Sequence, residues 1–326
     1  MSIDAFPLVL RRTSSCRAAI VAAAAGVLLV AGLPAHGQDA LEITSDRSVV
    51  KVAAGDRPVL EYQYVQRPRK PYVKAWYSPG GVNVLRDAPF DHLHHHSLMF
   101  AVAIDGVDFW SENEKCGHEK HVRLADTSSS VRDGVAWCTL AQEIDWVGPD
   151  AETLVAKERR TVDVCRTGDP AASLVVWSTS LAAPPGKESV TLTGSTYFGL
   201  GMRFVQSMDT GGRFVNADGK AGVEGTNDVR SRWCAYSAAA DGKPVTVAMF
   251  DCPGNPRHPA TWFTMDSRFA YLAATLGLDH EPLVVKAAEP LELRYAVALW
   301  DGQVEPAEIE KLYGQLVRWS AEAQKP

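Results

Sequence analysis

The sequence lacks the marks of several large protein classes. After residue 33 no apolar run reaches the ~20 residues that a membrane-spanning helix needs, and no run of basic residues is present. The chain carries 33 Lys and Arg against 39 Asp and Glu, which gives a net charge of −6. Domains that bind nucleic acid usually carry a basic patch. We therefore expect no nucleic-acid partner, and no membrane span once the N-terminal segment has been removed.

Several widespread catalytic motifs are missing as well. The sequence contains no G-x-S-x-G elbow, no phosphate-cradling glycine-rich loop, no H-E-x-x-H and no paired C-x-x-C. The Gly-Leu-Gly at 199–201 precedes no helix pattern, so it does not mark a dinucleotide site. Strands do not alternate with helices, which argues against a parallel α/β fold.

Residues 1–37 follow the order of an export signal. Three arginines precede an apolar run of Ala, Val and Leu at 18–33, and the small residues Ala35 and Gly37 close it. Because the run is shorter than a membrane span, the pattern predicts a cleaved signal peptide rather than an anchor. We expect residues 38–326 to form the mature chain, in the periplasm or outside the cell.

The chain has six cysteines, five of which follow the predicted signal. An oxidising compartment permits disulfides, and an odd count leaves at least one thiol free or bonded to another chain. Cys234 and Cys252 flank the turn Ala-Asp-Gly-Lys at 240–243, so they are the pair best suited to bridge a hairpin. For Cys138 and Cys165, a bridge and two buried free thiols are equally open.

Short strands separated by turns dominate the pattern after residue 38. Asp-Gly, Pro-Gly and Gly-Gly turns recur, and β-branched and aromatic residues are enriched between them at 73–77, 98–104, 173–181, 189–198 and 244–250. Many short strands at this spacing are typical of an antiparallel sandwich or barrel. We predict an all-β fold, a large antiparallel β-sandwich that residues 38–326 form as a single domain.

A C-terminal helix is the one helical element that the pattern supports. Pro306 suits the first helical position. Apolar residues then recur at helical spacing, at Ile309, Leu312, Tyr313, Leu316 and Val317. We expect this helix to pack on the sandwich.

The most unusual feature is the tract Asp-His-Leu-His-His-His-Ser at 91–97, which holds four of the nine histidines. On a strand, His92, His94 and His96 would share one face, with His95 opposite. Three imidazoles on one face suit a metal such as Zn, Cu or Fe. They also suit acid/base catalysis, because an unperturbed histidine titrates near pH ~6.5. A solvated polar loop is the structural alternative.

A second group of polar side chains lies in the proline-rich segment 251–263. Rigid loops on a sheet often carry binding groups, and arginine can hold a carboxylate with two hydrogen bonds. The segment would present Asn255, Arg257, His258 and Trp262. A turn whose Asn and Arg only satisfy backbone carbonyls explains the segment equally well.

Acid/base chemistry on sugars also calls for carboxylates, which sequence alone cannot pair. Candidates are Asp91, Asp108, Glu112, Glu143, Glu158 and Asp266. Glu158 falls within a predicted strand, where a buried carboxylate needs a partner. The nine tryptophans offer flat faces that suit sugars, although most are expected in the core.

Several motifs occur in an order that resembles a known family. They include D-H-L-H-H-H-S-L at 91–98, D-G-V-D-F-W at 105–110, T-Y-F-G-L-G-M-R-F at 196–204, W-C-A-Y at 233–236 and N-P-R-H-P-A-T-W at 255–262. Together with the segment around Glu158, they resemble a family of secreted bacterial proteins labelled "methane oxygenase PmoA-like". The likeness runs from about residue 60 to 303.

The resemblance implies a fold and a set of site residues. The family is similar to galactose-mutarotase-like sandwiches, which are common in carbohydrate enzymes, so a mutarotase-like supersandwich is expected. Its label is not expected to describe the activity, because a methane monooxygenase subunit needs several membrane spans. The family usually has Pro, Arg and Gly at Leu93, His96 and Ser97, which leaves His96 an uncertain member. The implied site residues are Asp91, His92, His94, His95, Asn255, Pro256, Arg257, His258 and Trp262.

We therefore expect a carbohydrate-active enzyme, a hydrolase, lyase or epimerase, that acts on a small sugar or an oligosaccharide. The expected acid/base groups are His92, His94, His95 and His258, with Glu158 as their carboxylate partner. The residues expected to hold the substrate are Asp91, Arg203, Asn255, Arg257 and Trp262. Two alternatives stay open, a metalloenzyme whose histidines ligate a divalent metal and a sugar-binding module without catalysis.

Overall fold

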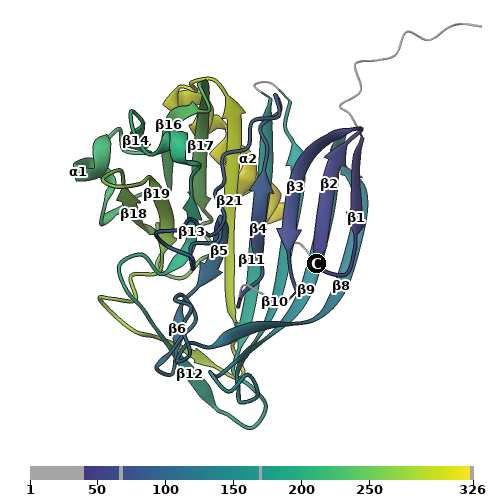
Figure 1. The fold of residues 1–326 in the computed structure, drawn as a ribbon, viewed down its shortest axis with the longest axis vertical. Coiled ribbons are helices and arrows are strands. Elements are labelled where there is room, and N and C mark those ends of the chain that lie inside the picture. Colours follow the sequence, from purple (N-terminus) through teal and green to yellow (C-terminus); the bar gives the residue numbers. More distant parts are fainter. Residues whose placement is uncertain (1–39, 66–68, 169–170, 324–326) are drawn as a thin grey trace, which may run out of the picture. The chain divides into compact units, whose positions relative to one another are not determined.

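The computed structural model describes residues 40–65, 69–168 and 171–323, and two large antiparallel sheets dominate them (Figure 1). The predicted signal peptide, residues 1–37, lies outside the described residues. Within the described part of the chain, no helix is both long and apolar enough to cross a membrane.

The larger sheet has nine strands. In spatial order they are β1 (Leu41–Ser45), β2 (Val49–Ala54), β3 (Arg57–Gln63), β4 (Tyr72–Trp76), β5 (Leu98–Ala101), β13 (Gly199–Arg203), β19 (Tyr271–Thr275), β18 (Thr261–Met265) and β15 (Val229–Arg230). The first strand of the described residues, β1, lies at the edge of this sheet.

The second sheet has eight strands. In spatial order they are β14 (Arg213–Asn216), β16 (Trp233–Ala240), β17 (Lys243–Asp251), β21 (Leu291–Asp301), β11 (Ala172–Ala182), β10 (Leu154–Arg166), β9 (Val135–Val147) and β8 (His118–Arg132). A small sheet has the order β20 (Leu283–Lys286), β12 (Ser189–Thr193), β6 (Ala103–Ile104) and β7 (Val107–Asp108). The helical elements are η1 (Gln206–Met208), α1 (Gly222–Thr226) and α2 (Pro306–Ala323).

The eight-stranded sheet is buried on both faces because its central strands carry apolar residues on both. Along β11, Val175 and Trp177 belong to the core that the two large sheets share, whereas Leu174 and Val176 pack in a second core with α2. Figure 1 shows α2 lying along this sheet, behind β21. The predicted antiparallel β-sandwich and its C-terminal helix are confirmed, and the helix begins at Pro306 as expected.

The predicted disulfide between Cys234 and Cys252 is not formed, and all five described cysteines are free and buried. Cys234 on β16 faces the core between the large sheets, and its partner across the hairpin is Met249. Cys252 follows β17 and lies beside Val317 and Ser320 of α2. The two thiols therefore lie on opposite sides of the sheet.

Cys138 and Cys165 also form no disulfide, and for the same reason. Cys138 belongs to the core between the two large sheets, whereas Cys165 belongs to the core beneath α2. Of the two alternatives for this pair, the structure has the buried free thiols.

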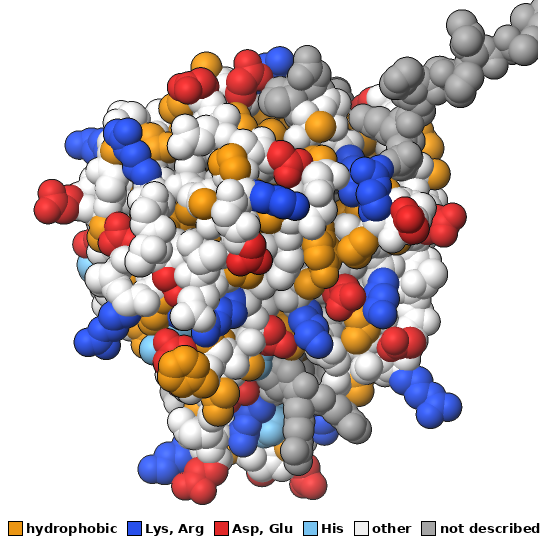
Figure 2. All heavy atoms as spheres, turned by 45° about the horizontal axis from the view of Figure 1, so that its top comes forward, with side chains coloured by type: hydrophobic (Ala, Val, Ile, Leu, Met, Phe, Trp, Pro, Cys, Tyr) orange, Lys and Arg blue, Asp and Glu red, His pale blue; other side chains and the backbone are white. Residues whose placement is uncertain are grey.

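Charged side chains of both signs cover the face of the molecule that Figure 2 displays. Figure 2 shows acidic and basic side chains interspersed over the face that it displays, with no broad patch of one sign there. A protein that binds nucleic acid through its backbone phosphates gathers its basic residues on one face, and this face has no such gathering.

Candidate functional site

The histidine tract forms consecutive turns rather than a strand. The backbone N–H of His92 donates to the carbonyl of Pro89 at 2.9 Å, and the N–H of His95 donates to the carbonyl of His92 at 2.9 Å. Strand β5 begins only at Leu98. The predicted strand alternation is therefore wrong, because these turns bring a different set of three imidazoles together.

His92, His94 and His95 converge on one cavity of ≈ 430 Å³. Their ring centroids lie 4.5, 4.8 and 5.8 Å apart. The cavity is within the ~300–1,000 Å³ that small-molecule sites usually occupy. Ser111 completes the polar part of the lining, and the rest is Trp110, Tyr197, Phe263, Met265, Phe269 and Tyr271.

The nine-stranded sheet supplies one side of this cavity. Met265 on β18 pairs with Tyr271 on β19, and Phe263 pairs with Ala273, so these four side chains share one face. Gly201 on the next strand, β13, leaves space on that face. A Cβ at this position would lie 2.3 Å from the hydroxyl oxygen of Tyr271. The glycine therefore lets Tyr271 lie flat across the sheet.

His92 is oriented by a carboxylate. Its Nδ1 lies 3.0 Å from Oδ2 of Asp91, and since a carboxylate only accepts, Nδ1 donates and Nε2 is left with a lone pair. Nη2 of Arg203 lies 3.6 Å from the same carboxylate oxygen. Partial burial opposes ionisation of Asp91, but its hydrogen bond with His92 and the charge of Arg203 lower its pKa overall.

The other two imidazoles of the cavity are kept neutral by their surroundings. Burial is the main cause that lowers the pKa of His95 to about 2, and the neighbouring His94, His92 and Arg203 act in the same direction. Burial is also the main cause that lowers the pKa of His94. Both rings are therefore neutral at neutral pH, but His95 with its low pKa is a very weak base, so His94 is the better proton acceptor of the two.

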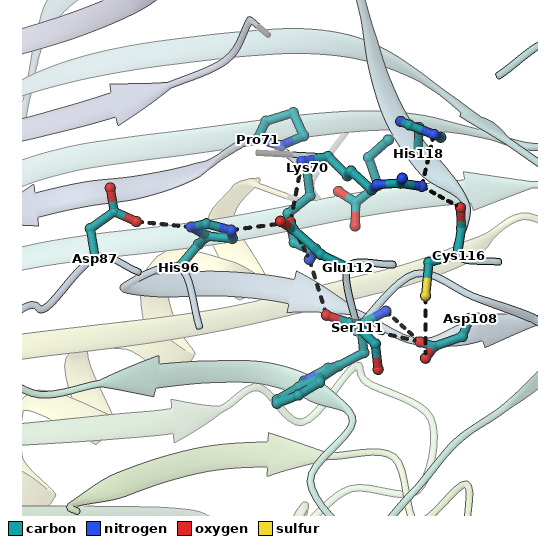
Figure 3. Close-up of polar contacts among 12 residues, drawn as sticks. Lys70, Pro71, Asp87, His96, Asp108, Ser111, Glu112, Cys116 and His118 are labelled. Carbon is teal, nitrogen blue, oxygen red and sulfur yellow. Dashed lines mark hydrogen bonds and ion pairs between the residues drawn. The ribbon is translucent and has the colours of Figure 1, made fainter. Parts of the chain in front are cut away.

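His96 does not line the cavity. It lies between two carboxylates (Figure 3). Its Nδ1 is 2.8 Å from Oδ1 of Asp87, and its Nε2 is 3.1 Å from Oε1 of Glu112. Both nitrogens must donate, so the ring is an imidazolium. Burial opposes this charge, but the two hydrogen bonds outweigh burial and raise the pKa of His96.

Glu112 joins this cluster to the wall of the cavity. It receives a hydrogen bond from Nζ of Lys70 at 3.0 Å, and it follows Trp110 and Ser111, which line the cavity. Burial would raise the pKa of Glu112, yet His96 and Lys70 lower it to about 2. The sequence offered Glu112 as one of six carboxylates, but nothing in its spacing indicated this partnership.

The 255–258 loop does not reach the histidine cavity. Nδ1 of His258 lies 2.6 Å from Oδ2 of Asp251, and Nδ2 of Asn255 donates to Oδ1 of Asp251 at 2.6 Å. Asn255 also exchanges two hydrogen bonds with the backbone of Arg294, at 2.6 and 2.8 Å. These contacts close the loop on β17 and β21, so the expected meeting of His258 with the histidine tract is not formed.

Arg257 and Trp262 also act within the loop region. Nη1 and Nη2 of Arg257 donate to four backbone carbonyls between Leu276 and Pro282 at 2.7–3.3 Å. Trp262 is buried, and its Nε1 donates to the carbonyl of Ser231 at 2.7 Å. Both side chains therefore bind backbone carbonyls. For Arg257 this is the structural alternative that the sequence left open.

Glu158 is buried elsewhere and is fully engaged. Its two carboxylate oxygens accept hydrogen bonds from Nε and Nη2 of Arg160 at 2.7 Å each, from Trp146 at 2.8 Å and from Thr179 at 3.0 Å. Nη2 of Arg160 also donates to Glu119 at 2.9 Å. Glu158 is therefore not the carboxylate partner of the histidines, because Arg160 already neutralises it within the core.

The metal alternative finds no ligand set. Within residues 40–65, 69–168 and 171–323, no three His, Cys, Asp or Glu side chains are arranged to hold a metal ion. The imidazoles of the cavity are directed to Asp91, to one another and to aromatic rings instead.

The aromatic lining of the cavity could not be recognised from the sequence. Trp110 and Tyr197 lie inside the motifs at 105–110 and 196–204, but nothing in those motifs indicated that the two side chains face the histidines. His94 lies 4.9 Å from Trp110 between ring centroids, and Trp110 lies 4.6 Å from Tyr197. Phe263 and Met265 alternate with buried residues on β18, a pattern that indicates a strand face without indicating what covers it.

Residues 49–314 match the model of the Family of unknown function (DUF6807). Its description names no activity, so the methane oxygenase-like label stays a prediction from the motifs. A comparison with curated proteins gave no match.

Solved structures give a distant likeness. The chain is similar to a GH36 alpha-galactosidase from Geobacillus stearothermophilus, with a TM-score of 0.44 and 9% identity over 80% of this chain and 41% of that one. It is also similar to a galactose mutarotase related enzyme from Lactobacillus acidophilus, with a TM-score of 0.39 and 9% identity over 81% and 99% of the two chains. At these TM-scores the likeness carries no argument about activity.

The Glu158 cluster gives a stability prediction. Arg160→Met leaves two buried carboxylates without their cation, and breaking a buried pair in this way costs about 3–5 kcal/mol of unfolding free energy. Arg123→Met is the matched control, because Arg123 is 59% exposed in its pair with Glu143 and such pairs contribute less than about 1 kcal/mol. Urea denaturation measures both, and equal losses would contradict the assignment.

His95 gives a pH prediction. Its pKa falls from an ordinary 6.5 to about 2 on folding, so below pH 6.5 the unfolded chain binds a proton that the folded chain does not. The free energy of unfolding therefore falls as the pH falls through this range. Between pH 7 and pH 5, His95→Gln should lose about 2 kcal/mol less than the wild type. Identical losses in urea titrations at the two pH values would show that His95 titrates normally.

Proposed function

We propose that this chain, which belongs to the Family of unknown function (DUF6807), is a carbohydrate-active enzyme of the periplasm or the extracellular space. The description of the family names no activity, so the proposal rests on the cavity. Its proposed chemistry is proton transfer by histidines. The observation that carries the proposal is the convergence of His92, His94 and His95 on one aromatic cavity.

His92 has the surroundings of a general base. Oδ2 of Asp91 accepts a hydrogen bond from Nδ1 of His92 at 3.0 Å. This leaves Nε2 of the neutral ring as the proton acceptor, and the carboxylate stabilises the ring when it becomes charged. Nη2 of Arg203 lies 3.6 Å from the same oxygen of Asp91, and its charge helps to lower the pKa of this carboxyl group. A base oriented by a carboxylate in this way is the arrangement that proton abstraction needs.

His94 supplies a second proton-transfer group in the same cavity. Its ring centroid lies 5.8 Å from that of His92 and 4.8 Å from that of His95. Burial lowers its pKa, so it is neutral when the reaction begins. A histidine that removes a proton from the substrate becomes charged and can return the proton at a neighbouring point, which supports an epimerase or a lyase.

The aromatic lining supports a sugar as the substrate. Trp110, Tyr197 and Phe269 present rings to the cavity beside the imidazoles. Aromatic rings pack against the C–H faces of small ligands, while neighbouring polar groups fix their orientation. The exposed Phe90 and Leu93 extend the apolar surface of the tract outward, which suits a substrate of the size of a monosaccharide or a short oligosaccharide.

Hydrolysis by a pair of carboxylates is less well supported than proton transfer. Most glycoside hydrolases place two Asp or Glu side chains about 5–9.5 Å apart around the bond that breaks. None of the described residues that line this cavity is an Asp or Glu. Asp91 lies behind His92, and Glu158 is neutralised by Arg160 in the core.

The test is turnover of a sugar panel by the full chain, followed by proton NMR. Neutral and oxidised mono- and disaccharides are incubated with the wild type and with His92→Asn. Loss of the general base should lower the rate on any substrate that the wild type consumes by about 10²–10⁴-fold.

His280→Asn is the matched control, because His280 is 63% exposed and lies outside the cavity. It should leave turnover unchanged. Full activity in His92→Asn would refute the proposed acid/base role. If the wild type binds a sugar without turning it over, and His92→Asn still binds that sugar, the result would favour a sugar-binding module without catalysis.

A further inference from the structure

We propose that the sugar taken by this cavity carries a carbonyl group, and that Tyr271 and Arg203 hold its oxygen. The assignment rests on the proposed histidine function and names the substrate class of the same site. It starts from buried polar atoms at the cavity that the folded chain leaves unpaired.

Three side chains carry these unpaired atoms. Within the described part of the chain, the hydroxyl of Tyr271, the Nδ1 of His95 and both Nε and Nη1 of Arg203 have no hydrogen-bond partner. Tyr271 and His95 line the cavity, whereas Arg203 is 1% exposed and packs against the lining residue Phe269 without lining the cavity itself. Buried polar groups in native proteins are nearly always paired, so unpaired ones that gather at one cavity indicate a missing ligand or ordered water.

The unpaired groups belong to one corner of the site. Arg203 on β13 and Tyr271 on β19 are directly paired in the sheet. The guanidinium carbon of Arg203 lies 3.5 Å from the ring centroid of Phe269, which lines the cavity. Nη2 of Arg203 is turned to Asp91 at 3.6 Å and Asp209 at 4.0 Å, so Nε and Nη1 are the donors that remain.

The chemistry of these groups selects an oxygen acceptor. A guanidinium can only donate, and a tyrosine hydroxyl without a partner has its proton free to donate. A ligand atom that satisfies both at once must accept two hydrogen bonds, which a carbonyl oxygen does with its two lone pairs. Gly201 preserves this corner, because any side chain there would displace the Tyr271 hydroxyl.

Charge favours a neutral acceptor over an anion. Arg203 and Arg86 already face Asp91 and Asp209 at 3.6–4.0 Å, so the local charges balance. A carboxylate or a phosphate would add negative charge that nothing offsets. A ketone oxygen is neutral when it binds and becomes negative only during the reaction, so the two donors would act most strongly in the transition state.

The step that follows is enolisation of a keto-sugar. The C–H bond beside the carbonyl breaks, its proton passes to Nε2 of His92, and its electron pair forms a carbon–carbon double bond. The carbonyl electrons move onto the oxygen, where Tyr271 and Arg203 stabilise the charge. Return of that proton from His92 restores the sugar, with a solvent hydrogen at this carbon once the imidazolium proton has exchanged with water. Alternatively, a substituent on the next carbon leaves with its bonding electron pair and takes the proton from His92, which gives the elimination product.

The experiment measures exchange of carbon-bound hydrogen with deuterated water by proton NMR. The full chain is incubated separately with 3-ketoglucose, glucuronate and glucose, each beside an enzyme-free sample. We expect the C–H signals next to the ketone to disappear faster with the protein than without it, and the glucose signals to remain. Exchange in glucuronate but not in 3-ketoglucose would overturn the assignment of a ketone and would show that Tyr271 and Arg203 bind a carboxylate instead.

Tyr271→Phe tests the oxygen-binding role within the same assay. Removal of one donor from such a pair should slow exchange by about 10²–10³-fold. The melting temperature should not fall, because the hydroxyl has no partner to lose. A purely structural tyrosine would show the reverse, a lower melting temperature with unchanged exchange. Tyr313→Phe, on α2 beneath the other sheet, is the control and should change neither value.

The outcomes separate this inference from the proposed function. Turnover that depends on His92, without exchange in 3-ketoglucose, would overturn the carbonyl assignment and leave the acid/base proposal standing. Exchange that His92→Asn does not slow would overturn the acid/base proposal, and the inference with it. If Tyr271→Phe does not fold, the comparison of 3-ketoglucose with glucose in the wild type still decides, because it needs no variant.

Discussion

The imidazolium of His96, held between Asp87 and Glu112, is the interaction on which the cavity depends (Figure 3). It ties the end of the histidine tract to the segment that carries Trp110 and Ser111, which are separate in sequence and form facing parts of the lining. Lys70 adds a second cation to Glu112 at 3.0 Å. Because His96 and Lys70 are buried and the two carboxylates are partly buried, the loss of one member leaves a charge without its partner, which is more costly than the loss of a surface pair.

This anchor explains how one tract can hold imidazoles in two protonation states. His96 meets two carboxylates and is charged, whereas His94 and His95, two and one residues earlier, meet aromatic rings and are neutral. The two environments lie next to each other in the sequence, because His94 and His95 line the cavity whereas the following residue, His96, meets Asp87 and Glu112. The cavity thus receives neutral bases from a segment that is fixed by a charged one.

The fold could be predicted from the sequence because it depends on local patterns. Alternating apolar residues and recurring turns indicated the sandwich, and Pro306 with its helical spacing indicated α2. The site could be predicted only in part. The density of histidines singled out the tract at 91–97. Its conformation, however, depends on turns and on the contact of His96 with Glu112, 16 residues further along the chain. Polarity alone also singled out Glu158 and His258, which pair with Arg160 and Asp251 away from the cavity.

The central claim is that the imidazoles of the tract, and no other histidines, meet a sugar in an acid/base cavity. Nitrogen-15 NMR of the histidine side chains, recorded while a sugar substrate is added to the full chain, tests it directly. The account predicts that the signals of His92, His94 and His95 shift, while those of His258 and His280 stay in place. Unchanged signals in the tract, or shifts confined to His258, would contradict it.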